Sequence, residues 1–117
     1  MKIFITKGNF NAVGEYADGK VLVRKGSTIN PSFAPYIKGI SKAVQYRKDA
    51  DYVDKKWSVI KDCEFSSPST AAQFVMGQSR DGYDAWKVES GESLGKHLAA
   101  NGQREWKRKQ QIKKSKN

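Results

Sequence analysis

The sequence predicts a single α+β domain, in which a small, mostly antiparallel sheet built from hairpins carries about three short helices on one side. An Asp-Gly pair joins two β-compatible runs near the N-terminus, and a Ser-Pro pair starts a short helix of small residues in the middle of the chain. A chain of 117 residues with 38% hydrophobic residues can bury one modest core. We expect residues 1–102 to form this domain and residues 103–117 to form a basic, flexible tail.

The N-terminal part predicts three strands. Lys2–Thr6 alternates in polarity in the way a half-buried strand does. Ala12–Ala17 and Lys20–Lys25 flank Asp18-Gly19, and such a pair is a strong hairpin signal because the primed turns require positive φ.

The next segment predicts one helix and a second hairpin. Pro35 suits the first position of a helix, and apolar residues from Tyr36 to about Lys48 recur at helical spacing. Two short β-like runs, Tyr52-Val53 and Trp57–Lys61, suggest a wing-like hairpin around the polar residues between them.

The stretch from Phe65 to Lys87 is the most informative part of the chain. Ser67 is a good N-cap, Pro68 a good first helical residue, and Gly77 a suitable left-handed C-terminal residue. Asp81-Gly82 predicts a tight turn, followed by a strand over Tyr83–Val88.

A last short helix is predicted after Ser90-Gly91. Leu94 and Leu98 would face inward, and Asn101-Gly102 would close the helix.

The charge of the chain indicates an anionic partner. The net charge is +10 and the isoelectric point is about 9.8, which favours nucleic acid first and a membrane surface second. Residues 103–117 hold seven basic residues against Glu105 alone, a net +6, so +4 is left for residues 1–102. The alternative is a domain with a solubilising basic end.

The chemistry-bearing residues give little support to catalysis, a metal or a cofactor. Cys63 is the only cysteine and His97 the only histidine, so a cysteine-rich zinc site is excluded. Asp49, Asp51 and Asp54 lie close in sequence, but their spacing is not that of a calcium loop. We therefore expect a protein that is not an enzyme.

The cysteine count also bears on location. A single cysteine allows no disulfide within the chain, which fits a reducing cytoplasm. The N-terminal residues show no signal-peptide pattern and no window reaches the length of a membrane span, so we expect a cytoplasmic protein.

The stretch FSSPSTAAQFVMGQSRDGYDAWK, residues 65–87, resembles the signature of the domain of unknown function 4357 family. Residues 14–27, GEYADGKVLVRKGS, are similar to that family's hairpin, and residues 57–65 to the strand before the signature. Asp81 stands where the pattern has Asn, and Thr70 where it has Ala. The resemblance spans roughly residues 1–98. It implies an association with GIY-YIG nuclease domains and restriction-modification proteins, although this chain carries no such nuclease domain.

The candidate site residues combine hydroxyl, basic and aromatic side chains. Hydroxyls at a helix start attract anions, arginine and lysine hold phosphates, and tryptophan stacks on bases. For each, a structural role is the alternative: a serine caps the helix, Trp86 belongs to the core and the cations are solvated. The candidates for binding nucleic acid are Lys25, Ser27, Ser66, Ser67, Ser69, Arg80, Trp86, Lys87, Lys107, Arg108, Lys109, Lys113 and Lys114.

The expected function is non-catalytic binding of nucleic acid, DNA in the first place, as an accessory to a restriction, repair or mobile-element system. The alternative is a protein-interaction module that docks to a nuclease or methyltransferase and exposes an apolar patch around Ala71, Ala72, Val75 or Trp86. A small metal-dependent nuclease around Asp49–Asp54 is the third reading.

Overall fold

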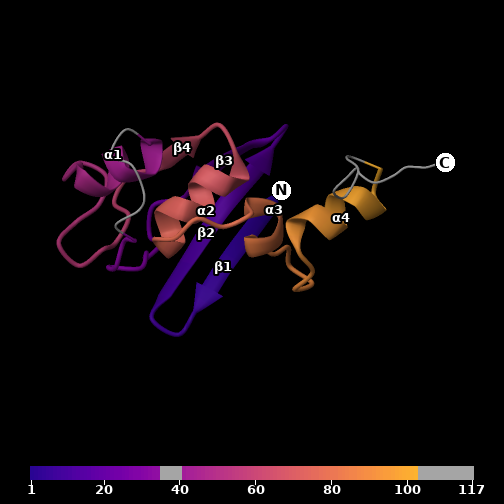
Figure 1. Ribbon diagram of the computed structural model, residues 1–117, viewed down its shortest axis with the longest axis horizontal. Helices are drawn as coiled ribbons and strands as arrows, with labels where there is room; N and C mark the ends of the chain where they lie inside the picture. The colour runs from indigo at the N-terminus through magenta and orange to yellow at the C-terminus, as the bar shows by residue number, and fades with distance from the viewer. Residues whose placement is uncertain (35–40, 103–117) are drawn as a thin grey trace.

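The computed structural model describes residues 1–34 and 41–102, and it confirms the predicted α+β class. Four antiparallel strands form one sheet in the order β1-β2-β3-β4. The helix α2 lies across one face of this sheet and packs on β3 and β4, while α1 and α3 pack against α2 and α4 packs against α3 (Figure 1). The elements are β1 (Lys2–Lys7), β2 (Phe10–Ala17), β3 (Lys20–Val23), α1 (Lys42–Lys48), β4 (Cys63–Phe65), α2 (Pro68–Met76), α3 (Gly82–Ala85) and α4 (Leu94–Ala100).

The hairpin between β2 and β3 confirms the tight turn that the Asp18-Gly19 pair predicts. Asp18 and Gly19 have φ values of 48° and 82°, and Ala17 pairs with Lys20 across the turn. This backbone twist matches that of the two strands. The register turns Val21 and Val23 into the core and leaves Lys20 exposed at the start of β3.

The core lies between the sheet and α2. Ile3 and Ile5 of β1 and the two valines of β3 are 2% exposed or less, as are Phe74 and Val75 of α2. Core residues run from Ile3 to Leu98. The described residues up to Gly102 therefore contain one continuous core, and the predicted tail at 103–117 lies outside the described residues.

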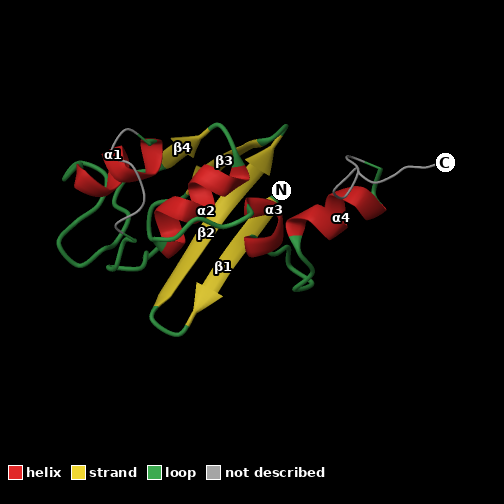
Figure 2. Cartoon of the chain, in the orientation of Figure 1, coloured by secondary structure: helices red, strands yellow, loops and turns green. Residues whose placement is uncertain are grey.

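The helix α2 begins and ends where its sequence signals predict. The hydroxyl of Ser67 accepts the backbone N–H of Thr70 at 3.2 Å, and Pro68 is the first helical residue. Gly77 ends the helix in the left-handed conformation, with φ 74°. Figure 2 shows this helix in front of the sheet.

Two predicted elements in the middle of the chain differ from the structure. The helix α1 begins at Lys42, because Ser41 is extended and its hydroxyl caps Val44; the predicted first residues, 35–40, lie outside the described residues. As a pair of regular strands the predicted wing-like hairpin is wrong, but its two runs do pair: an antiparallel bridge joins Val53 to Val59, and Ile60 N–H donates to the Tyr52 carbonyl at 2.8 Å. Asp54 holds the turn between them by accepting the backbone N–H groups of Lys56 and Ser58.

The strand predicted over Tyr83–Val88 is also wrong. Asp81 caps a one-turn helix, α3, by accepting the N–H of Tyr83 at 3.0 Å. Extended backbone returns at Lys87, which exchanges two hydrogen bonds with Phe4 of β1 and so covers that edge of the sheet. The polar Asp81-Gly82 pair thus starts a helix instead of forming a free turn.

Candidate nucleic-acid interface

The first turn of α2 is held by its own side chains. The Ser67 carbonyl accepts the N–H of Ala71, and the Ser67 hydroxyl accepts that of Thr70. Pro68 has no N–H to offer, and Gly82 of α3 packs against the peptide between Pro68 and Ser69. Because these groups are used or covered, the predicted docking of a phosphate on the helix N-terminus does not fit the structure.

A hollow of about 350 Å³ lies on one side of this turn. It lies between the start of β3, the start of α1 and the end of β4. We call it the lysine hollow; its lining residues are Lys20, Lys42, Glu64, Phe65 and Ser66. Both lysines are exposed and form no ion pair with a described residue, although Lys42 Nζ lies 5.3 Å from the centre of the Tyr46 ring. Two cations thus line the same hollow as the exposed Ser66, one of the predicted site residues.

A smaller hollow of about 160 Å³ lies along the other side of the turn. We call it the arginine hollow; its lining residues are Ser69, Thr70, Gln73, Ser79 and Arg80. The Ser69 hydroxyl accepts the N–H of Gly82 at 2.9 Å, and the exposed guanidinium of Arg80 donates to the Gln78 side chain at 3.2 Å. Gln73 Nε2 already donates to Ser79 and the Thr70 hydroxyl shares a hydrogen bond with Ser67, so the Ser69 hydroxyl and the remaining N–H groups of Arg80 are the main donors for a phosphate here.

The structure therefore brings Ser66, Ser69 and Arg80 to the surface around one helical turn, with Lys20 and Lys42 added. Sequence reasoning missed both lysines. Lys20 is the first residue of β3 and pairs with Ala17, and Lys42 is the first residue of α1. Their positions follow from the pairing of β3 with β4 and from the packing of α1, which no local pattern reveals.

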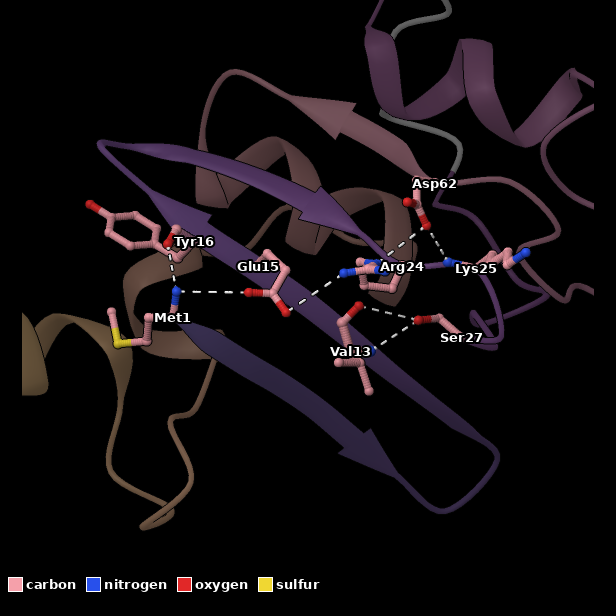
Figure 3. A network of polar contacts seen from close by, with 8 residues as sticks. All are labelled: Met1, Val13, Glu15, Tyr16, Arg24, Lys25, Ser27 and Asp62. Carbon is pink, nitrogen blue, oxygen red and sulfur yellow. Dashed lines mark hydrogen bonds and ion pairs between the residues drawn. The ribbon is translucent and has the colours of Figure 1, made fainter.

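Two exposed candidates lie outside these hollows. The ammonium of Lys87 donates to the Asp84 carbonyl at 2.7 Å, while its backbone pairs with β1. Lys25 follows β3 at the end away from the lysine hollow, and its backbone N–H donates to the Asp62 carboxylate at 2.8 Å (Figure 3). The structure does not bring these two cations together with Ser66 or Arg80.

Two predicted site residues are buried, and their binding role is wrong. Ser27 is 3% exposed, and its hydroxyl accepts the N–H of Val13 and donates to the carbonyl of the same residue (Figure 3). Trp86 is 0% exposed, and its indole N–H donates to the Pro68 carbonyl at 3.1 Å. Neither side chain can contact a strand of nucleic acid without opening the core.

The face of the sheet that the helices leave open carries paired charges. The N-terminal amine of Met1 and the guanidinium of Arg24 each lie 3.8 Å from the Glu15 carboxylate, and Arg24 lies 3.5 Å from the Asp62 carboxylate (Figure 3). This alternation of sign leaves no uniform attraction for a polyanion. The open face therefore fits nucleic acid less well than the surface around α2.

A third hollow, of about 530 Å³, lies beside the β2–β3 turn. Its lining residues are Met1, Tyr16, Ala17, Asp18, Gly19 and Leu98. Although it is larger than the other two, the charged groups of its described lining residues are the carboxylate of Asp18 and the N-terminal amine of Met1, which lies 3.8 Å from the Glu15 carboxylate. It therefore suits an anionic partner less well than the lysine hollow.

The surroundings of the acidic residues at 49–54 and of Cys63 are those of structural residues. The Asp49 carboxylate accepts the N–H of Asp51, and among residues 1–34 and 41–102 no group of three acidic, histidine or cysteine side chains is placed to hold a metal. Cys63 is buried; burial, with added effects from Asp62 and Asp49, raises the pKa of its thiol from 9.0 to about 12. The thiol is therefore protonated at neutral pH and is not a nucleophile.

The apolar patch that a protein-interaction module would need is absent from the predicted residues. Ala71, Ala72, Val75 and Trp86 are all 0% exposed. Within the described part of the chain, the exposed large hydrophobic residues are Met1 and Ile60. In the described residues, every helix lacks the length and apolar character needed to cross a membrane.

The comparisons with known proteins agree with the resemblance found in the sequence. No curated protein and no solved structure matches the chain. The model of one family matches residues 3–98, which include both hollows and all the core residues from Ile3 to Leu98. The predicted basic tail lies beyond the match. The chain belongs to the family described as the domain of unknown function DUF4357.

Proposed function

We propose that this protein binds nucleic acid, in the first place DNA, without catalysing a reaction on it. The observation that supports the proposal is the gathering of exposed cations and of hydroxyl groups in two hollows beside the first turn of α2. Lys20 and Lys42 would neutralise phosphates on one side, and Arg80 would do so on the other. A role as an accessory to a restriction, repair or mobile-element system is part of the same proposal.

The two hollows suit a chain of phosphates better than a single anion. Each holds at least one cation, and residues 65–70 run without a break from one hollow to the other. A backbone with regularly spaced charges can contact both at once, and its affinity then falls as salt rises because counterions are released on binding. The seven basic residues of 103–117 would add contacts that do not depend on base sequence.

The test compares the full chain with a chain that ends at Gly102. The shorter chain keeps every described core residue, from Ile3 to Leu98, so it retains the packing that forms both hollows. Fluorescence anisotropy with a labelled DNA strand and a labelled duplex is measured over a series of salt concentrations. We expect the shorter chain to bind at low salt, with a shallower dependence on salt than the full chain.

Failure of the shorter chain to bind any DNA would contradict the proposal for the folded domain. Binding would then belong to residues 103–117 alone, and docking to a nuclease or methyltransferase protein would become the better proposal. In that case, a pull-down that persists at high salt and after removal of the tail would support the protein partner.

A further inference from the structure

We propose that the lysine hollow receives one unpaired nucleobase that carries an exocyclic amino group, so that the protein prefers single-stranded DNA to duplex. This inference rests on the proposed function and specifies the ligand of one part of the surface. It is carried by the composition of the hollow, which combines the apolar stems of two lysines with two ammonium groups and one carboxylate that form no ion pair with a described residue.

The size of the hollow fits a single base. Its volume of about 350 Å³ lies at the lower end of the roughly 300–1,000 Å³ found for pockets that hold small ligands. A base inside a duplex is stacked and paired, so it cannot enter a hollow of this kind without being extruded at a cost of a few kcal/mol. A single strand presents its bases without that cost, because they are already unpaired.

Phe65 closes the bottom of the hollow. Its ring is 1% exposed and lies 5.3 Å from that of Tyr46 and 5.2 Å from that of Phe74, so it supports the hollow from below and is not itself open to a base. The alkyl stems of Lys20 and Lys42 add apolar surface at the sides, while their ammonium groups remain in solvent. The lysine stems can lie along the faces of a base, which leaves their charges free for its phosphates.

Glu64 is the residue that would make the hollow favour a base over a bare phosphate. Its backbone N–H donates to the Tyr46 hydroxyl at 3.2 Å, which fixes the main chain at this point of β4. Its carboxylate is exposed and has no hydrogen-bond or ion-pair partner among the described residues. A carboxylate repels phosphate, but it accepts hydrogen bonds from an amino group such as N4 of cytosine.

This acceptor predicts a preference among bases. At the position where cytosine has its amino group, thymine has the oxygen O4, which is itself an acceptor and would face the Glu64 carboxylate unfavourably. The lysines and the Ser66 hydroxyl would donate to the remaining acceptors of the base or to the flanking phosphates. Cytosine should therefore bind better than thymine in the same strand context.

The experiment uses the full chain and three labelled probes of equal length: oligodeoxycytidylate, oligothymidylate and a duplex of mixed sequence. Affinities are measured by fluorescence anisotropy at one salt concentration. We expect both single strands to bind more tightly than the duplex, and the cytosine strand to bind about three- to ten-fold more tightly than the thymine strand. Comparing the cytosine and thymine strands on one protein cancels the sequence-independent contribution of residues 103–117, because the two strands carry the same backbone charge.

The variant Glu64→Gln keeps the shape of the side chain and removes its charge. We expect it to bring the ratio of cytosine to thymine affinity close to one, while the affinity for the thymine strand rises because a repelling charge is gone. Glu89→Gln makes the same charge change at an exposed position outside the hollow, and it should leave the ratio unchanged. Thermal unfolding of both variants checks that the fold is intact.

Three outcomes are decisive. Tighter binding of the duplex than of both single strands would overturn the inference and leave the proposed function standing. A cytosine preference that survives Glu64→Gln would overturn the role of this carboxylate. Absence of binding to all three probes would overturn the proposed function, and the inference with it.

Discussion

Gly82, the first residue of α3, lies directly against the carbonyl group of Pro68, the first residue of α2. A side-chain carbon at position 82 would overlap that carbonyl and the neighbouring nitrogen of Ser69. The N–H of Gly82 in turn donates to the Ser69 hydroxyl at 2.9 Å. The absence of a side chain at this glycine therefore allows α3 to close over the start of α2, which places the arginine hollow beside it.

We expect Gly82→Ala to destabilise the protein by about 1–3 kcal/mol or more, because the added methyl group would push the backbone segments of two helices apart. Chemical denaturation followed by circular dichroism measures the free energy of unfolding. Gly8→Ala is the matched control, since nothing lies within 4 Å of a side-chain carbon built at that position. Equal stability of the two variants would show that the contact at Gly82 can relax freely.

Trp86 also connects α2 and α3, from inside the core. Its indole N–H donates to the Pro68 carbonyl at 3.1 Å, and its ring approaches Gly14 of β2. Trp86→Phe keeps an aromatic ring but removes the donor and leaves volume unfilled. We expect a loss of stability of at least about 1 kcal/mol, from the lost buried hydrogen bond and from the volume left unfilled. A loss below 0.5 kcal/mol, on the order of a surface substitution, would contradict this role.

Arg47 is a buried cation that ties α1 to two other segments. It is 9% exposed, its Nε donates to the Phe74 carbonyl at 3.0 Å, and its Nη2 donates to the Asn30 carbonyl at 2.6 Å. The guanidinium lies 4.5 Å from the centre of the Phe33 ring. Burial lowers the pKa of this group from 12.5 to about 10, so it remains protonated at neutral pH.

We expect Arg47→Lys to be destabilising although the charge is kept, because an ammonium cannot reproduce the planar set of donors that reaches both carbonyls. The loss should reach about 1–3 kcal/mol, the cost of one orphaned buried carbonyl, or more. Lys48→Arg, at the exposed neighbouring position, is the control and should leave the free energy of unfolding unchanged. Identical denaturation midpoints for the two variants would contradict the proposed role of Arg47 in holding α1 to these two segments.

The Cys63 thiol should resist modification in the native protein. Burial raises its pKa to about 12. At pH 8 the thiol is therefore neither accessible to a reagent nor ionised. We expect the thiol reagent DTNB to react slowly with the native protein and at once with the unfolded protein, as measured by absorbance. Fast reaction of the native protein at pH 8 would show that β4 opens readily.

The same shift predicts a dependence of stability on alkaline pH. The folded state keeps the proton of Cys63 over the range in which the unfolded state loses it, between about pH 9 and 12. The stability that this group contributes is therefore complete below pH 9 and is lost as the pH rises towards 12. The difference in unfolding free energy between Cys63→Ala and the parent, followed over this range, isolates the contribution of Cys63 from that of Arg47. A difference that is constant with pH would contradict the assignment.

Local signals predicted the elements whose geometry is set by a few neighbouring residues. The Asp18-Gly19 turn, the Ser67 cap and the Gly77 ending all depend on backbone conformations that those residue types favour, and all three are confirmed. The error at 83–88 has the same origin. Asp81-Gly82 suits a turn as well as a helix start, and only the packing of Gly82 against Pro68 decides between them.

The candidate site depends on contacts between distant segments, and sequence reasoning found only part of it. Ser66, Ser69 and Arg80 were predicted because they lie near one helix start. Lys20 and Lys42 join them through the pairing of β3 with β4 and the packing of α1 on α2. The sequence around Trp86 does not distinguish a tryptophan that faces solvent from one in the core, and only the structure shows that this side chain is buried.

The most direct test of the central claim is the DNA affinity of the full-length double variant Lys42→Gln, Arg80→Gln as a function of salt. Its matched control is Lys55→Gln, Lys96→Gln, which removes the same charge at two exposed lysines outside both hollows. We predict that only the first variant binds more weakly, with a salt slope reduced by about two, because two phosphate contacts are lost. Equal affinity and equal slope for the two double variants would contradict the claim that the surface around the first turn of α2 binds nucleic acid.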